Sequence, residues 1–123
     1  MNLVDSCGWV EFFCDSPLAG KYAHAIENTS DLVVPTICVY EVFKKILTDV
    51  GEQEALQAMA TMRLGHVEEL TDQLAVSAAF LSRQHKLPMA DAIVYATARN
   101  KGATVWTQDS HFKNLPAVKY LGK

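Results

Sequence analysis

Short apolar runs alternate along this chain with much longer stretches of helical periodicity. Leu3–Val4, Leu32–Val34 and Thr104–Thr107 are runs of this kind, and they show no alternation of polar and apolar positions. Apolar strands without alternation are typical of a parallel sheet that helices cover on both faces. The sequence therefore predicts an α/β sandwich with a short, mainly parallel sheet of four to five strands.

The intervals between these runs carry apolar residues three and four positions apart, which is the spacing of helices. Thr36 and Thr71 are suitable N-caps, and Pro88 stands at the first position of a further helix. Two successive helices are predicted to form a hairpin over residues 36–64. Helices are expected at 9–13, 17–27, 36–50, 52–64, 71–86 and 88–101, and weaker strands at 67–70 and 118–121.

Length and charge narrow the class of protein. The 123 residues fit one compact domain over residues 1–123. The chain has 11 basic and 14 acidic side chains, so its formal charge is −3. A protein that coats duplex nucleic acid through phosphate contacts usually carries a clear positive excess, so this balance argues against such a coat. It does not exclude a nucleic-acid enzyme whose own site is acidic.

Cysteine usage and the apolar windows indicate a cytoplasmic protein. The three cysteines include no C-x-x-C pair, so neither a disulfide framework nor a thiolate zinc site is indicated. The first residues lack the basic start of a signal peptide. The longest apolar window lies between Asp31 and Glu41 and is far shorter than the roughly 20 residues of a membrane helix. We expect no membrane segment.

Four acidic residues occupy the places where an open α/β sheet builds its site. Asp5 directly follows the first strand, and Asp109 follows the strand at 104–107. Glu41 lies early in the helix after the second strand, and Asp91 lies in the first turn of the helix that Pro88 begins. The carboxyl ends of parallel strands meet at one edge of the sheet, and ligands bind there. The spacing therefore predicts that the four carboxylates belong to one site.

Each acid alone also has an ordinary structural role. Asp5 suits an N-cap, Glu41 suits an ion pair with Lys45, Asp91 suits a helix N-terminus, and Asp109 suits an Asx turn. Taken together they are better explained by a cation, because crowded carboxylates repel one another unless a cation neutralises them. Carboxylate oxygens are the ligands that Mg²⁺ and Mn²⁺ prefer. Such a centre activates water for attack on a phosphate.

Four short motifs follow one another at domain-sized spacing, and each contains one of these acids. They are Val4-Asp5-Ser6 with Trp9, Pro35-Thr36 with Glu41-Val42, Leu87-Pro88-Met89-Ala90-Asp91-Ala92-Ile93, and Thr107-Gln108-Asp109-Ser110-His111-Phe112. Together they resemble the PIN domain family, and most closely its small toxin ribonucleases of VapC type. The resemblance covers essentially the whole chain. It departs from many relatives at Cys7, where they carry a second serine.

The resemblance implies a three-layer α/β/α sandwich with a protruding helical hairpin. It also implies an endoribonuclease that cuts single-stranded or loop RNA of the tRNA or rRNA class. Asp5, Glu41, Asp91 and Asp109 would hold one or two Mg²⁺ or Mn²⁺ ions. Water activated there would attack phosphorus and leave a 5′-phosphate and a 3′-hydroxyl.

The resemblance also suggests supporting residues and partners. The hydroxyls of Ser6 and Thr107 would orient waters or an acid, and Arg99, Lys113 and His111 are candidates for contacts with RNA phosphates. Members of the family usually form homodimers. A cognate VapB-type antitoxin blocks them by wrapping the hairpin, here residues 36–64, and by placing a basic side chain in the acidic pocket.

Two other functions fit the same fold. One is a PIN nuclease of RNA maturation or decay, and the other is a catalytically silent PIN-like binding module. The four intact acids argue against the silent module. A phospho-acceptor signalling domain fits poorly, because it needs its acid at the end of a middle strand and a lysine after the last strand.

Without the four acids, ten acidic side chains remain against 11 basic ones, so the rest of the chain is nearly neutral.

Overall fold

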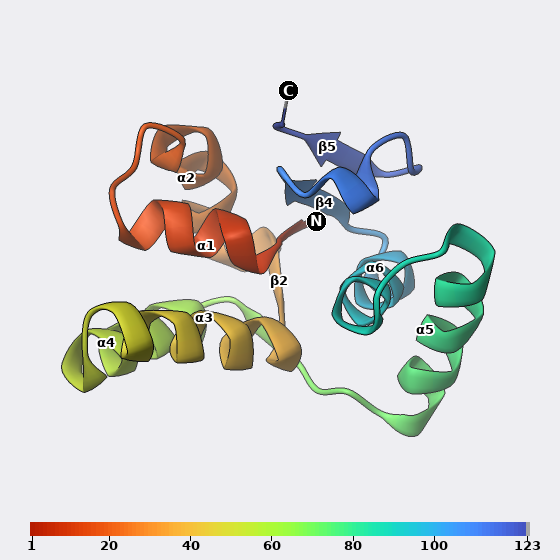
Figure 1. Cartoon of the computed structure of the whole chain (residues 1–123), viewed down its shortest axis with the longest axis horizontal. Coiled ribbons are helices and arrows are strands. Elements are labelled where there is room, and N and C mark those ends of the chain that lie inside the picture. Colours follow the sequence, from red (N-terminus) through yellow and green to blue (C-terminus); the bar gives the residue numbers. More distant parts are fainter. Residues whose placement is uncertain (123) are drawn as a thin grey trace.

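The computed structural model describes residues 1–122 (Figure 1). Its five strands are β1 (Asn2–Val4), β2 (Leu32–Pro35), β3 (His66–Glu68), β4 (Thr104–Thr107) and β5 (Val118–Tyr120). Its helices are α1 (Ser6–Phe13), α2 (Ala19–Glu27), α3 (Thr36–Asp49), α4 (Glu52–Met62), α5 (Asp72–His85) and α6 (Met89–Lys101), with 3₁₀ turns η1 (Thr29–Asp31) and η2 (Ser110–Phe112).

The five strands form one sheet in the order β3-β2-β1-β4-β5, and every pairing in it is parallel. The chain steps from β1 to β2 to β3 in one direction and then crosses back to β4. Because crossovers between parallel strands are right-handed, the helices before β3 cover one face and those after it cover the other. Figure 1 shows this division, with α1 to α4 on the left and α5 and α6 on the right. The predicted α/β sandwich is confirmed.

The three central strands are buried along most of their length, whereas the edge strands β3 and β5 are not. All four residues of β2 are buried, and so are Leu3 and Val4 of β1. The sheet reverses its direction of growth between β1 and β4. This is the point at which open α/β sheets leave a crevice at the carboxyl ends of their strands.

Gly8 brings the first two helices close together. A Cβ atom at this position would lie 2.5 Å from the Tyr22 ring and 2.7 Å from a methyl group of Val4. No side chain larger than hydrogen fits there without a shift. The start of α1, which carries Asp5 and Ser6, is therefore held tightly against α2 and β1.

The helical hairpin consists of α3 and α4, which pack along one another within the predicted span of 36–64. The predicted N-cap of one helix and the predicted first residue of another are each wrong by one position. Thr36 is the first residue of α3 and Pro35 is its N-cap, because β2 runs directly into the helix. Pro88 likewise precedes α6 as its N-cap. Thr71 caps α5 as predicted, since its side chain accepts a hydrogen bond from the Leu74 N–H at 3.1 Å.

The first two helices also differ from expectation at their ends. The helix α1 begins at Ser6 rather than near Trp9, because Asp5 caps it. The next helix begins at Ala19 rather than at Pro17. Within residues 1–122, no helix is both long enough and apolar enough to cross a bilayer.

Candidate metal centre

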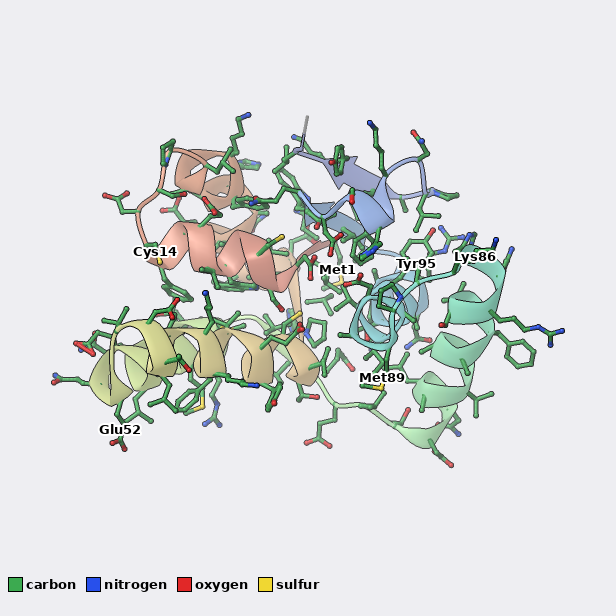
Figure 2. The ribbon with its side chains drawn as sticks, in the orientation of Figure 1. Met1, Cys14, Glu52, Lys86, Met89 and Tyr95 are labelled. Carbon is green, nitrogen blue, oxygen red and sulfur yellow. The ribbon has the colours of Figure 1, made fainter. Side chains whose placement is uncertain are left out.

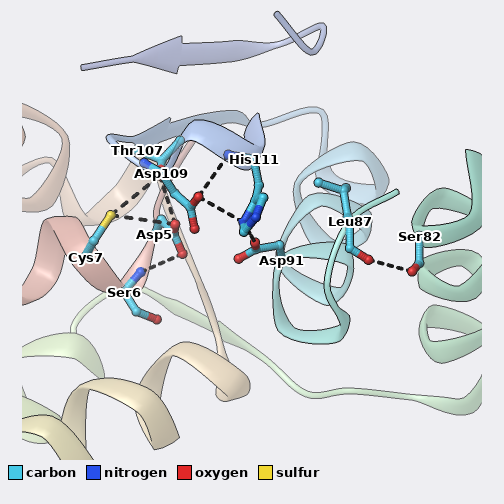
Figure 3. A network of polar contacts seen from close by, with 9 residues as sticks. All are labelled: Asp5, Ser6, Cys7, Ser82, Leu87, Asp91, Thr107, Asp109 and His111. Carbon is cyan, nitrogen blue, oxygen red and sulfur yellow. Dashed lines mark hydrogen bonds and ion pairs between the residues drawn. The ribbon is translucent and has the colours of Figure 1, made fainter. Parts of the chain in front are cut away.

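The four acids come from four separate elements that meet at the carboxyl edge of the sheet. Asp5 is the N-cap of α1 after β1, and Asp109 is the N-cap of η2 just beyond β4. Asp91 lies in the first turn of α6, and Glu41 in the second turn of α3. The carboxylates are close enough for their charges to interact. The charges of Glu41 and Asp109 raise the pKa of Asp5, and the charges of Asp109 and Asp5 raise the pKa of Asp91. Figure 3 shows three of them side by side.

Asp5 is the most buried member and the most firmly held. Only 5% of it is exposed. Its Oδ1 accepts the Ser6 N–H at 2.8 Å, and its Oδ2 accepts the Thr107 hydroxyl at 2.9 Å (Figure 3). The Cys7 thiol lies 3.7 Å from the same Oδ2. These contacts fix the orientation of the carboxylate before any ligand arrives.

Two residues with hydroxyl groups, Thr107 and Ser6, connect Asp5 to Asp109 and Glu41. Thr107 is fully buried, and besides donating to Asp5 its Oγ1 accepts the Asp109 N–H at 3.0 Å. The Ser6 hydroxyl donates to Glu41 Oε1 at 2.7 Å. Ser6 and Thr107, the predicted supporting residues, therefore each contact an acid.

His111 lies between the two more exposed acids. Its Nδ1 is 2.9 Å from Asp91 Oδ2 and 3.1 Å from Asp109 Oδ1 (Figure 3). One ligand atom from each of these three residues lies within 4.8 Å of the other two. Sequence reasoning expects His111 to contact RNA phosphate, whereas in this structure its ring contacts the acids.

The electrostatics of the cluster favour a bound cation. Burial raises the pKa of Asp5, and the charges of Glu41 and Asp109 raise it further against the hydrogen bonds from Thr107 and Ser6. Burial and the charges of Asp109 and Asp5 raise the pKa of Asp91 to about 6. Raised carboxyl pKa values mean that negative charge is unfavourable here without a counter-charge. A hard divalent cation with oxygen ligands fits this donor set.

Cys7 and Tyr22 are site neighbours that motif reasoning does not assign to the site. Burial and the charge of Asp5 raise the pKa of the Cys7 thiol to about 11, which favours the protonated thiol at neutral pH. The Tyr22 hydroxyl donates to Gln108 Oε1 at 2.7 Å, and Gln108 separates Thr107 from Asp109. Cys7 could have been found from its place two residues after Asp5 at a helix start, whereas nothing in the sequence pairs Tyr22 with Gln108.

Among the described residues, neither candidate phosphate-binding cation forms an ion pair with the four acids. Arg99 is eight residues beyond Asp91 on α6, which corresponds to about 12 Å along the helix axis. Its guanidinium lies 6.0 Å from the centre of the Tyr95 ring. Lys113 directly follows η2 and is exposed, with its ammonium 5.8 Å from the centre of the Tyr120 ring.

A second surface lies on the hairpin and is apolar. It is a groove of about 950 Å³ between α3, α4 and the edge strand β3. Tyr40 is 60% exposed there and Leu47 is 43% exposed. The groove begins at Thr36, near the end of α3 that carries Glu41. Its apolar lining comprises Val39, Tyr40, Phe43, Leu47, Met59 and Val67.

Comparisons with known proteins agree with this architecture. The profile of a family described as PIN domain matches residues 3–118. A search of curated proteins finds no significant match.

Among solved structures, the chain is similar to a toxin–antitoxin complex from Klebsiella pneumoniae. The TM-score is 0.82 at 21% identity, over 97% of this chain and 96% of that one. It is similar to Mycobacterium tuberculosis VapC20, described as a sarcin–ricin loop cleaving toxin, with a TM-score of 0.76 at 20% identity over 96% and 97%. It is also similar to DNA-bound VapBC from Salmonella typhimurium, with a TM-score of 0.71 at 16% identity over 99% and 98%. These likenesses show a shared fold.

Proposed function

The chain belongs to the PIN domain family, and we propose that it is a metal-dependent endoribonuclease acting as the toxin of a VapBC-type pair. We propose further that residues 1–123 form one PIN domain that acts in the cytoplasm. The observation that carries the proposal is the meeting of four carboxylates from four elements at one sheet edge, where the pKa values of Asp5 and Asp91 are raised. Carboxylates under this mutual repulsion suit a site that a cation completes.

Asp5, Glu41, Asp91 and Asp109 would hold one or two Mg²⁺ or Mn²⁺ ions. When bound, the ion supplies an activated water and neutralises charge on the phosphate. The chain's own residues supply the framework for this chemistry. The Ser6 N–H and the Thr107 hydroxyl hold the Asp5 carboxylate in one orientation. The carboxylate therefore does not need to reorient during the reaction.

The proposed substrate is single-stranded or loop RNA, of the tRNA or rRNA class. The near-neutral surface outside the acids suits a short loop better than a long duplex, since duplex coating needs many basic contacts. Lys113 is exposed beside η2 and is the best placed cation for a phosphate near the acids, followed by Arg99. The similar VapC20, which is described as cleaving the sarcin–ricin loop, supports an RNA loop as the substrate.

The proposed partner is a VapB-type antitoxin that binds the hairpin 36–64. An amphipathic helix lays its apolar face into a groove of this kind. Because the groove starts at Thr36, one end of such a segment comes near Glu41 and the acidic pocket. A basic side chain on that segment would enter the pocket in place of the metal. The described similarity to toxin–antitoxin complexes supports this partner.

The chain is also proposed to form a homodimer. Exposed apolar side chains support this, because Val76 and Phe80 lie four residues apart on one face of α5 and are both more than half exposed. Met89, labelled in Figure 2, is also more than half exposed at the first residue of α6. Changing Phe80 to Glu places a charge on that face, and light scattering would then report a monomer. A dimer that persists in the Phe80→Glu variant would contradict this choice of face.

The proposed activity is tested by incubating the purified chain with a structured RNA. We expect cleavage with Mn²⁺ or Mg²⁺ and none with EDTA. Cleavage that survives EDTA contradicts the metal mechanism, and no cleavage of any structured RNA favours a silent binding module.

The toxin role has its own test. Expression in a bacterial host should arrest growth, and co-expression of the product of the adjacent upstream reading frame should relieve the arrest. Active nuclease without arrest favours a nuclease of RNA maturation or decay.

A further inference from the structure

We propose that His111 is itself a metal ligand, so that the site binds Mn²⁺ more tightly relative to Mg²⁺ than a site of carboxylates alone. The proposal rests on the proposed metal-dependent function and adds a nitrogen donor to its site. It replaces the sequence-based expectation that His111 contacts RNA phosphate.

The ring of His111 already lies where a ligand is needed. Its Nδ1 is 2.9 Å from Asp91 Oδ2 and 3.1 Å from Asp109 Oδ1. Ions of this size hold their ligands at about 2.1 Å, so adjacent ligands in an octahedron are about 3 Å apart. The two distances from His111 Nδ1 to the carboxylate oxygens therefore suit hydrogen bonds and also suit neighbouring ligands of one ion. An ion can replace the shared proton with little movement of the side chains.

The backbone fixes His111 in this place. The N–H of His111 donates to Asp109 Oδ1 at 2.9 Å, so the short turn η2 is closed by the acid that the ring contacts. Phe112, the next residue, is fully buried and anchors the turn to the core. The His111 side chain is 53% exposed, which leaves open space beside the ring for solvent and substrate.

Ligand chemistry gives the expected selectivity. Mg²⁺ binds oxygen ligands and keeps several waters, whereas Mn²⁺ belongs to the first-row transition metals, which also bind sites that contain nitrogen. An Asp91–Asp109–His111 set is therefore of mixed oxygen and nitrogen type. Cys7 does not compete as a soft ligand, because its thiol is partly buried on the other side of Asp5 beside Thr107.

The test is electron spin-echo modulation of Mn²⁺ bound to the full chain at neutral pH. A directly bonded imidazole gives ¹⁴N modulation in the spectrum, and carboxylates give none. We expect this modulation in the unchanged chain and in His24→Asn, which removes an exposed histidine on α2. It should disappear in His111→Gln. The same samples give Mn²⁺ affinity, which should fall in His111→Gln by at least about tenfold, the loss seen when even an outer partner of a ligand is removed.

The outcomes separate the two proposals. Bound Mn²⁺ without ¹⁴N modulation in the unchanged chain overturns His111 as a ligand and leaves the four-acid nuclease standing. No Mn²⁺ binding at all contradicts both. Because the unchanged chain alone decides the first point, the result holds even if His111→Gln folds poorly.

Discussion

The acidic pocket and the hairpin groove are both incomplete in the isolated chain, but for opposite reasons. The pocket gathers negative charge that burial makes unfavourable, as the raised pKa values of Asp5 and Asp91 indicate. The groove exposes apolar side chains, including Tyr40 and Leu47, that a soluble monomer usually covers. A bound cation would neutralise the charge of the pocket, and an apolar partner would cover the groove. We therefore expect the two surfaces to bind different ligands and to be disrupted by different substitutions.

The largest effect should follow removal of the buried charge in the pocket. Asp5→Asn keeps the shape of the side chain but removes the carboxylate that three neighbours orient. We expect RNA cleavage to fall by at least about 10²–10³-fold, the loss typical when one preorganised electrostatic group is removed. Steady-state cleavage rates check this, with Asp72→Asn as the control, since Asp72 is an exposed acid in the first turn of α5. Near-normal cleavage by Asp5→Asn would exclude Asp5 from the reaction.

The next effect concerns the groove and leaves the four acids unchanged. Leu47→Asp places a charge in its apolar lining, and a buried leucine is worth about 1.5–3 kcal/mol. The affinity for the product of the adjacent upstream reading frame should fall by about tenfold or more, and calorimetry measures it. The matched control is Leu56→Asp, because Leu56 is 46% exposed on the same hairpin and does not line the groove. Equal losses from both variants would mean that the partner binds elsewhere on the hairpin.

Substitution of Asp91 is expected to stabilise the metal-free chain, whereas the preceding substitutions lower activity or affinity. Its pKa is about 6 in the folded chain and near 3.8 when unfolded, so the folded state holds the proton more tightly. Stability of the metal-free chain should therefore fall as pH rises from about 4 through 6. Asp91→Asn should raise the free energy of unfolding at pH 7.5 in EDTA by about 1–3 kcal/mol, and this gain should vanish near pH 4.

Urea unfolding at both pH values measures this gain. Asp72→Asn is again the control, because it removes an acid from a helix start without the neighbouring carboxylates. We expect it to lose a few tenths of a kcal/mol at pH 7.5. A destabilised Asp91→Asn at that pH would show that the pocket carries no unrelieved charge.

The smallest effect should come from the hydroxyl that supports Glu41. Ser6→Ala removes the 2.7 Å hydrogen bond to Glu41 Oε1 and leaves the backbone cap on Asp5 intact. Cleavage should fall by about tenfold, as for other supporting partners of metal ligands. Ser110→Ala, an exposed serine in η2, should change the rate by less than about twofold. Equal rates for Ser6→Ala and the unchanged chain would limit Ser6 to capping.

Most of the fold can be predicted from the sequence, because its strands are apolar without alternation and its helices are long. The strand at 104–107 and the cap at Thr71 are local signals, and both match the structure. The predicted N-cap at Thr36 and the predicted first helical residue at Pro88 are each one residue away from where the structure has them. There the chain turns directly from an extended segment into a helix, and propensity alone cannot say which residue caps it.

The site is less predictable from the sequence, because its side-chain hydrogen bonds join residues that are far apart in the chain. The sequence located the acids at strand and helix ends, since topology alone brings those ends to one edge. It could not pair Thr107 with Asp5, or the hydroxyl of Tyr22 with Gln108, because these contacts depend on side-chain packing. The position of the His111 ring between Asp91 and Asp109 depends on the shape of one 3₁₀ turn. The sequence does not specify that shape.

The chemistry of the RNA ends tests the central claim most directly. A labelled stem-loop RNA is cut by the purified chain over a range of free Mn²⁺ concentrations, and the new ends are identified. The four-acid site predicts 5′-phosphate and 3′-hydroxyl ends, formed at a rate that follows Mn²⁺ and stops in EDTA. Cyclic 2′,3′-phosphate ends formed in EDTA would instead show attack by the RNA's own 2′-hydroxyl. That result would contradict a role for the acids in activating water.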